Sequence, residues 1–288
     1  METLLMHAMC KINVGLDITG RREDGYHEIR TLMHTLELFD EMRFALSDEL
    51  TVSCPGIPQE DNIVTSAVRK TLQYAGIKGG LRVDIVKHIP SQAGLGGGST
   101  DAACAIRACS MLYSLDLSAD EMRKIALGVG ADVPFLIEGG SALCEGIGER
   151  LTPLKVGPLW PALIVMPPSL RVDTGEAYRW MDGVKDILPQ DFSRMIGLLE
   201  RGEGEVSPKN AFEAYVEKVS PESLGIRDAL ASLGAFACGL SGSGAAFYGL
   251  FRDEKALELA AEGMKSYSDT VIKSRLWGSS YRIVNSNI

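Results

Sequence analysis

The chain has 288 residues, enough for two modest domains or one large one, of which 45% are hydrophobic and 23% are charged. This composition is typical of an ordinary globular protein, and no apolar run is long enough to cross a bilayer. The formal net charge of −9 argues against nucleic acid or an anionic membrane surface as the main partner, although it permits an anionic small molecule where positive groups gather locally.

Cysteine usage and the first residues indicate a reducing compartment. The cysteines show no Cys-x-x-Cys spacing, which favours free thiols over disulfides or zinc ligands; they are Cys10, Cys54, Cys104, Cys109, Cys144 and Cys238. The first residues lack a basic and an apolar region of the kind that a secretory signal requires. We therefore expect a cytoplasmic protein with no membrane partner, acting as a monomer or a weak homodimer.

The N-terminal half alternates predicted strands with predicted helices. Its clearest start signals are the possible cap at Asp61 or Asn62 and the capping box that Ser118 and Glu121 form. The expected elements are a strand over 11–19, a helix over 63–74, a strand over 81–85, a helix over 102–113, a helix from 118 to Gly128 or Gly130, and a strand over 141–147.

Three prolines and a glycine interrupt residues 152–161, and we place a domain boundary there, dividing 1–155 from 156–288. Beyond it we expect strands at 162–166, 235–238, 245–251 and 270–276, with helices at 192–199, 226–233 and 253–264. Strands with helices on one side suggest a split β-α-β arrangement, so the fold class is α+β.

The segment Pro90–Asp101, which reads Pro-Ser-Gln-Ala-Gly-Leu-Gly-Gly-Gly-Ser-Thr-Asp, joins a predicted strand to a predicted helix. Four of the five residues 94–98 are glycines, which lack the Cβ atoms that would keep backbone N–H groups from a ligand. The next helix aims its free amides and positive dipole end at the same place, with Ser99 or Thr100 as expected N-cap. This pattern predicts a phosphate-binding loop rather than a flexible linker.

Two common phosphate loops are excluded at this segment. No Gly-x-x-x-x-Gly-Lys-Ser/Thr is present, because Ser99 and Thr100 follow Gly98 without a lysine. The dinucleotide fingerprint fails as well, since its third glycine or alanine would fall on Ser99.

Two charged residues are candidates for catalysis. Lys11 lies inside an apolar strand with Asn13 on the same face; such a lysine is usually at an edge or reaches water, but near phosphate it would stabilise developing negative charge. Asp132, in Gly130-Ala131-Asp132-Val133-Pro134, is by default a cap or turn residue. In a cleft it would instead accept the proton of a hydroxyl nucleophile.

Two further segments are candidates for substrate binding. Tyr26 offers a ring for stacking on a base and His27 offers two ring nitrogens, while the alternative for both is a strand start with one buried aromatic. The second glycine cluster, residues 239–244, by itself predicts a hairpin turn. A binding role becomes the better interpretation if the cluster faces the first loop across a cleft.

Together these segments resemble the GHMP kinase superfamily over essentially the whole chain. Its three motifs occur in order: the strand around Lys11, the loop Pro90–Thr100 and Ser241-Gly242-Ser243-Gly244-Ala245. The run from Thr19 to His27 is similar to that of the members which phosphorylate a cytidine-diphosphate-linked methylerythritol in non-mevalonate isoprenoid synthesis. The resemblance implies an N-terminal domain like domain 2 of ribosomal protein S5, a C-terminal ferredoxin-like domain, and a site in the cleft between them.

The resemblance also implies roles. Asp132 would be the base on the substrate's 2-hydroxyl, Lys11 its charged partner, and Mg²⁺ would arrive with ATP near Ser99 or Thr100. The implied nucleotide-binding residues are Asn62, Lys87, Pro90, Ser91, Gln92, Ala93, Gly94, Leu95, Gly96, Gly97, Gly98, Ser99 and Thr100, and the implied substrate-binding residues are Asn13, Tyr26, His27, Gly242 and Ser243.

Two alternative functions stay open at this point, and the sequence departs from the superfamily pattern at two places. The chain could be another kinase of the superfamily, acting on homoserine or mevalonate, or a non-catalytic nucleotide-binding member. It has Met9-Cys10 where the superfamily pattern has Pro-Ala before the lysine, and Ser91-Gln92-Ala93 where glycine-rich residues are frequent. Both departures bear on local backbone shape rather than on the assigned side chains.

Overall fold

A long antiparallel ribbon forms the centre of the computed structural model, which describes residues 2–155, 158–168, 170–184, 189–201 and 204–287. Its strands are β1 (Thr3–Arg21) and β2 (His27–Ser47). The strand expected at 11–19 lies within β1, but β2 was not predicted. Every residue from Thr31 to Leu36 is buried, so this strand has no apolar–polar alternation to identify it.

The remaining strands of the N-terminal sheet pair with this ribbon. They are β3 (Thr51–Ser53), β4 (Gly80–Val86), β5 (Ser141–Gly146) and β6 (Arg150–Pro153). The strand β4 pairs with β2 and β3, while β5 pairs with β2 and β6. The strand β6 corrects the sequence analysis, which placed an irregular break from residue 152.

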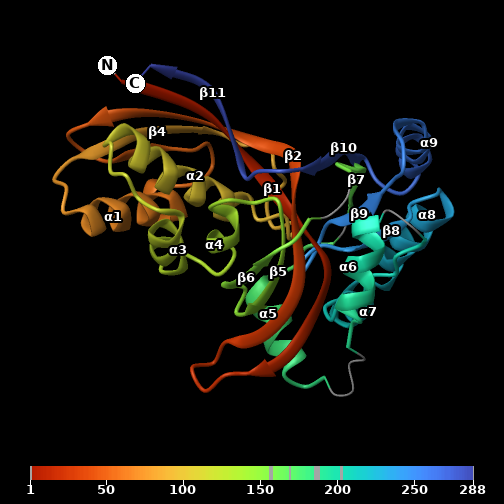
Figure 1. The fold of residues 1–288 in the computed structure, drawn as a ribbon. Helices are drawn as coiled ribbons and strands as arrows, with labels where there is room; N and C mark the ends of the chain where they lie inside the picture. Colours follow the sequence, from red (N-terminus) through yellow and green to blue (C-terminus); the bar gives the residue numbers. More distant parts are fainter. Residues whose placement is uncertain (1, 156–157, 169, 185–188, 202–203, 288) are drawn as a thin grey trace.

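Four helices cover one face of this sheet (Figure 1). They are α1 (Ile63–Ala75), α2 (Gly97–Leu112), α3 (Ala119–Leu127) and the short α4 (Val133–Leu136). The Asn62 side chain caps α1, and Ser118 and Glu121 form the capping box of α3, as the sequence predicts. A 3-10 turn, η1 (Gln59–Asp61), precedes α1.

The C-terminal sheet consists of β7 (Pro161–Met166), β8 (Ala237–Leu240), β9 (Phe247–Leu250) and β10 (Thr270–Trp277). Their order, β10-β7-β9-β8, with antiparallel neighbours, is that of a ferredoxin-like β-α-β-β-α-β unit. The accompanying helices are α5 (Thr174–Met181), α6 (Phe192–Arg201), α7 (Glu213–Val219), η2 (Pro221–Leu224), α8 (Gly225–Ser232) and α9 (Glu254–Met264).

Strands β10 and β11 pair with strands of the N-terminal sheet. In β10, Leu276 and Trp277 pair with Leu36 and Thr35 of β2, so the two sheets are continuous. The last strand, β11 (Tyr281–Asn287), returns to pair with β1, which brings the chain ends together (Figure 1). The sequence analysis missed β11, whose residues are mostly exposed at the sheet edge. The boundary predicted at residue 156 falls outside the described residues, as does Gly157.

A buried imidazole in β2 makes the stability depend on pH. Burial lowers the pKa of His34 from 6.5 to about 4. Between these values the His34 ring is protonated in the unfolded chain and neutral in the folded one, so the contribution of this group to stability falls as pH drops from about 6.5 towards 4, by up to about 3 kcal/mol. Urea unfolding is measured for the protein and for His34→Gln across this range, and the free energy of unfolding of the protein should fall relative to that of the variant as the pH drops. A difference between the two that does not change with pH would contradict the role of His34.

Candidate active site

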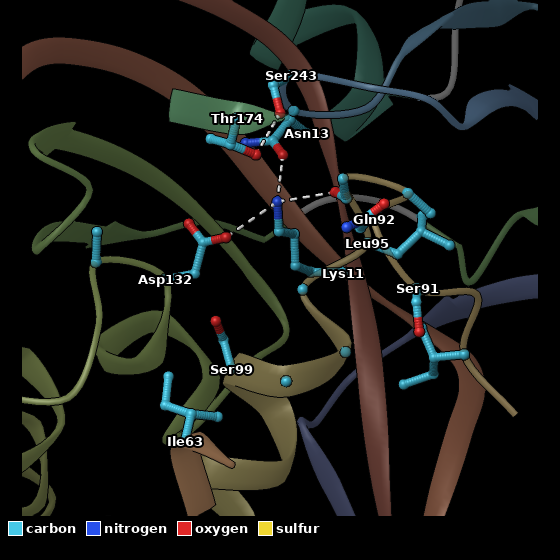
Figure 2. A pocket seen from close by; sticks show the side chains of 18 of the residues that line it. Lys11, Asn13, Ile63, Ser91, Gln92, Leu95, Ser99, Asp132, Thr174 and Ser243 are labelled. Carbon is cyan, nitrogen blue, oxygen red and sulfur yellow. Dashed lines mark hydrogen bonds and ion pairs between the residues drawn. The ribbon is translucent and has the colours of Figure 1, made fainter. Parts of the chain in front are cut away.

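A cavity of about 520 Å³ lies where the two halves meet. Lys11, Asn13 and Asp132 line it, together with Gly242 and Ser243 from the second glycine cluster. All the predicted nucleotide-binding residues except Thr100 line it as well, whereas Tyr26 and His27 do not. Residues from β1, the glycine-rich loop, α4 and the C-terminal half thus face one space (Figure 2).

Lys11 is buried in β1, and its ammonium group contacts three acceptor oxygens. Its Nζ donates to Asn13 Oδ1 at 2.6 Å and to the Gly94 carbonyl at 3.0 Å, and lies 3.3 Å from Asp132 Oδ2. Because the side chain is only 4% exposed, it does not reach bulk water, and the glycine-rich loop covers the edge of β1 at this point, where Lys11 N donates to Leu95 O. The lysine therefore places a positive charge between the carboxylate and the glycine-rich loop (Figure 2).

Asp132 lies at the start of α4, where its side chain makes no capping hydrogen bond. It is 30% exposed, and its carboxylate faces the cavity beside Lys11 (Figure 2). A carboxylate that is not occupied by a helix cap can accept a proton from a bound hydroxyl. The geometry thus agrees with the catalytic interpretation rather than with a cap, although Asp132 as base stays a prediction.

The glycine-rich loop packs against both halves through its backbone. Leu95 O accepts a hydrogen bond from Lys11 N, and Gly94 O accepts one from the Ser241 hydroxyl. A Cβ built on Gly94 would lie 2.0 Å from Ser241 O, so only glycine allows this approach. The two glycine clusters therefore face each other, as the sequence analysis required for the second cluster to be more than a hairpin turn.

The helix α2 begins earlier than expected. Its N-cap is Gly96, at φ +70°, and not Ser99 or Thr100. The Thr100 hydroxyl instead donates to Met9 O at 2.6 Å, and the residue is buried, so its side chain does not face the cavity. This orientation does not support a nucleotide or Mg²⁺ contact by the Thr100 side chain, and the role of the residue stays a prediction.

The start of α2 fits a phosphate chain. Thr100 N bonds to Gly96 O, whereas the amides of Gly97, Gly98 and Ser99 precede the first intrahelical donor. Glycines let a ligand approach these amides closely, and the helix dipole favours an anion there. The Ser99 side chain projects into the same space below Lys11 and Asp132 (Figure 2).

A buried charge cluster supports the base of the loop. Lys87, just after β4, pairs with Asp40 and with Asp101, whose Oδ2 lies 2.6 Å from Nζ. Asp40 also accepts from the backbone N–H groups of His88 and Ile89 at 2.6 and 2.8 Å. Burial raises the pKa of Asp101 to about 8, and its Oδ1 has no hydrogen-bond partner among the described residues.

The second glycine cluster is held by a residue that the sequence analysis did not single out. Asn210 Nδ2 donates to the carbonyls of Leu240 and Gly242 at 2.9 and 2.8 Å, and Asn210 is buried. At the tip of the cluster, the hydroxyls of Ser243 and Thr174 lie 2.9 Å apart (Figure 2). No local pattern marks Asn210, because its partners are distant in sequence.

Neither Tyr26 nor His27 lines the cavity, although His27 contacts a residue that does. Tyr26 is 58% exposed, so the alternative of a buried aromatic is wrong. The His27 ring stacks on Tyr178 of α5 at 4.9 Å, and its Nε2 lies 2.8 Å from Asp182 Oδ1. Since Tyr178 lines the cavity, this aromatic cluster forms its rim. Sequence reasoning missed Tyr178, and the substrate-binding roles of Tyr26 and His27 stay predictions.

Carboxylates alone do not build a metal site here. Among the described residues, no group of three His, Cys, Asp or Glu side chains is arranged to hold a metal ion. In nucleotide enzymes Mg²⁺ is usually bound through one or two carboxylates together with substrate phosphates and waters. Within the same described ranges, no helix combines the length and the apolar character that crossing a membrane requires.

Comparison with known proteins agrees with this architecture. Residues 62–140 match the model described as GHMP kinases N terminal domain, and residues 184–269 match GHMP kinases C terminal. A solved homoserine kinase from Cytophaga hutchinsonii, 18% identical, covers 98% of this chain and 97% of its own with a TM-score of 0.79, which shows the shared fold. Fold and cavity together define a GHMP kinase, with the expected two-domain α+β architecture.

Relatives with higher sequence identity show which family of GHMP kinases this chain belongs to. A protein of Caldicellulosiruptor bescii named 4-diphosphocytidyl-2-C-methyl-D-erythritol kinase is 35% identical over 93% of this chain and 96% of its own. One of the same name from Thermoanaerobacter pseudethanolicus is 35% identical over 96% of both. A crystal structure of 4-(cytidine 5'-diphospho)-2C-methyl-D-erythritol kinase, 33% identical, covers 96% of this chain and all of its own with a TM-score of 0.80. The chain belongs to this kinase family.

Proposed function

We propose that this protein transfers the terminal phosphoryl group of ATP to the 2-hydroxyl of 4-diphosphocytidyl-2-C-methyl-D-erythritol, a step of non-mevalonate isoprenoid synthesis. One observation carries the proposal: the Lys11–Asp132 pair and the open amides of α2 line the same cavity. A proton acceptor and a phosphate cradle in one space are what phosphorylation of an alcohol requires. The names of the relatives supply the particular alcohol.

In this proposal each group has one task. Asp132 accepts the proton of the attacking hydroxyl, and Lys11 stabilises the negative charge that develops beside it. The amides of Gly97, Gly98 and Ser99 bind the phosphates and orient them towards the hydroxyl. Bound Mg²⁺ would neutralise phosphate charge, which is its usual contribution to phosphoryl transfer.

The compartment, the partners and the oligomeric state of the protein are also proposed. We infer a cytoplasmic enzyme whose partner is this small substrate rather than nucleic acid or a membrane, acting as a monomer or weak homodimer. The acidic net charge of −9 and the free cysteines support the first part. The division into an ATP-binding part, 1–155, and a C-terminal part, 156–288, remains part of the proposal, since β11 rejoins the N-terminal sheet.

A substrate panel tests the activity. Purified protein with ATP and Mg²⁺ is given the cytidylated methylerythritol, mevalonate or homoserine, and ADP release is measured. We expect rapid release with the first alcohol and background rates with the others. Release with mevalonate or homoserine alone would assign the protein to another GHMP activity, and release with none would contradict a kinase role for these substrates.

The exposed ring of Tyr26 tests recognition of the cytidine. Tyr26→Ala is expected to raise KM for the cytidylated substrate about 5- to 150-fold, because base stacking contributes roughly 1–3 kcal/mol, while KM for ATP changes little. Tyr267→Ala removes a similarly exposed ring, 49% against 58%, from the chain after α9 and is the matched control. Equal KM values for Tyr26→Ala and Tyr267→Ala would remove Tyr26 from the base site.

A further inference from the structure

A one-directional hydrogen-bond chain leads to Lys11 from a residue outside the cavity lining. Thr31 of β2 is fully buried, and its hydroxyl donates to the Gly15 carbonyl at 2.7 Å. The same oxygen accepts a hydrogen bond from Asn13 Nδ2 at 2.9 Å. Asn13 Oδ1 in turn accepts from Lys11 Nζ at 2.6 Å. Both ends of this chain therefore lie in β1, while its central hydroxyl comes from β2.

The direction of every bond in the chain follows from its two ends. A carbonyl such as that of Gly15 can only accept, so it takes the single proton of the Thr31 hydroxyl. That hydroxyl then offers only lone pairs, and Asn13 must turn its NH₂ towards it. The Lys11 ammonium, at the other end, can only donate, and it meets the amide oxygen. The assignment of the Asn13 amide is thus consistent from both sides.

The backbone of β1 explains why Gly15 needs this partner. The pairing of β1 with β2 shifts register between Asn13 and Leu16, and Gly15 has φ +88°. An irregularity of this kind removes a carbonyl from the strand ladder, and such irregularities occur often next to active sites. The Thr31 hydroxyl satisfies the carbonyl, because an unpaired buried C=O would cost free energy.

We propose that Thr31 is a positioning residue for phosphoryl transfer: its hydroxyl sets the direction of the Asn13 amide, which holds Lys11 against Asp132. The inference rests on the proposed function for its kinetic consequence. Without the hydroxyl, the Asn13 NH₂ loses its acceptor, and only the Lys11 ammonium still orients the amide, so the acceptor that Asn13 offers to Lys11 is held less firmly. Thr31 does not touch substrate, so its effect reaches the reaction only through Asn13 and Lys11.

Three variants test the role. Thr31→Val keeps the shape and removes the hydroxyl, Thr31→Ser keeps the hydroxyl, and Thr71→Val is the matched control. Thr71 is equally buried and donates to Ala67 O at 2.8 Å, but it lies in α1, and neither residue lines the cavity. We expect Thr31→Val to lower kcat about 10- to 100-fold with KM for ATP within twofold, because small misplacement of catalytic groups is costly. Thr31→Ser and Thr71→Val should stay within about threefold of the unmodified protein.

The outcomes separate positioning from a general structural role. A kcat for Thr31→Val within twofold of the unmodified protein would overturn the inference, as would equal losses in Thr31→Val and Thr71→Val. Failure of Thr31→Ser to retain activity would overturn it too. If Thr31→Val does not fold, Thr31→Ala is measured in its place, and it should lower kcat in the same direction; an unchanged kcat counts against the role.

The position of Lys11 in crystal structures tests the role of Thr31 independently of the proposed reaction. In crystal structures without substrate, the distance from Lys11 Nζ to Asn13 Oδ1, 2.6 Å here, should exceed 3.5 Å in Thr31→Val and stay near its present value in Thr31→Ser. An unchanged distance in Thr31→Val overturns the positioning role even if the enzyme is active. If the unmodified protein phosphorylates none of the alcohols tested, the proposed function fails, while this distance still decides the role of Thr31.

Discussion

Asp132→Asn is expected to lower kcat by about 10²–10⁴-fold, the usual contribution of a general base. The amide keeps the shape of the carboxylate but cannot accept the proton of the attacking hydroxyl. It also leaves Lys11, which is only 4% exposed, without the carboxylate 3.3 Å away, so the charge arrangement at the hydroxyl is lost as well. Steady-state release of ADP with the cytidylated substrate measures the effect.

Nucleotide binding separates this loss from misfolding. The amides of α2 are untouched in Asp132→Asn, so the dissociation constant for an ATP analogue, measured by calorimetry, should remain within about threefold. Asp84→Asn removes a carboxylate from β4, where Asp84 faces Arg82 at 3.5 Å on the surface, and should leave kcat unchanged. A kcat for Asp132→Asn equal to that of Asp84→Asn would show that Asp132 is not the base.

Gly94→Ala is expected to weaken ATP binding strongly. A methyl group there would lie 2.0 Å from Ser241 O, so the loop and the second glycine cluster must separate. The residue also has φ +72°, which costs an alanine about 1–2 kcal/mol. Because Gly94 O accepts from both Lys11 and Ser241, the shift also disturbs the catalytic lysine. We expect ATP affinity to fall about 100-fold or more, by calorimetry.

A second glycine isolates the backbone strain. Gly76, which follows α1, has φ +66° and open space where a Cβ would lie. Gly76→Ala therefore carries the same kind of strain without a clash, and it should lower stability by about 1–2 kcal/mol while ATP affinity stays unchanged. If Gly94→Ala lost no more stability or affinity than Gly76→Ala, the close packing of the two glycine clusters would not be required for binding.

Features that depend on residues close together in the sequence could be predicted from it. The sequence predicts a cap of α1 at Asp61 or Asn62, the capping box at Ser118 and the glycine-rich loop before a helix, because each depends on residues a few positions apart; Asn62 is the one that caps α1. The start of α2 was wrong by a few residues, since Gly96 in a left-handed conformation caps it and Thr100 turns to Met9 O instead. Serine and threonine preferences alone do not show that choice.

What sequence alone determined is the set of local motifs and, through their order, the resemblance to a kinase class. Which side chains meet across the molecule depends on the folded chain. Lys11 reaches Asp132 and Gly94, Lys87 pairs with Asp40, and Asn210 holds the second glycine cluster, across separations that no local pattern encodes. These contacts join residues that are far apart in the chain, and they form only when long-range strand pairing, much of it with β2, brings the segments together; packing rather than local propensity sets that pairing.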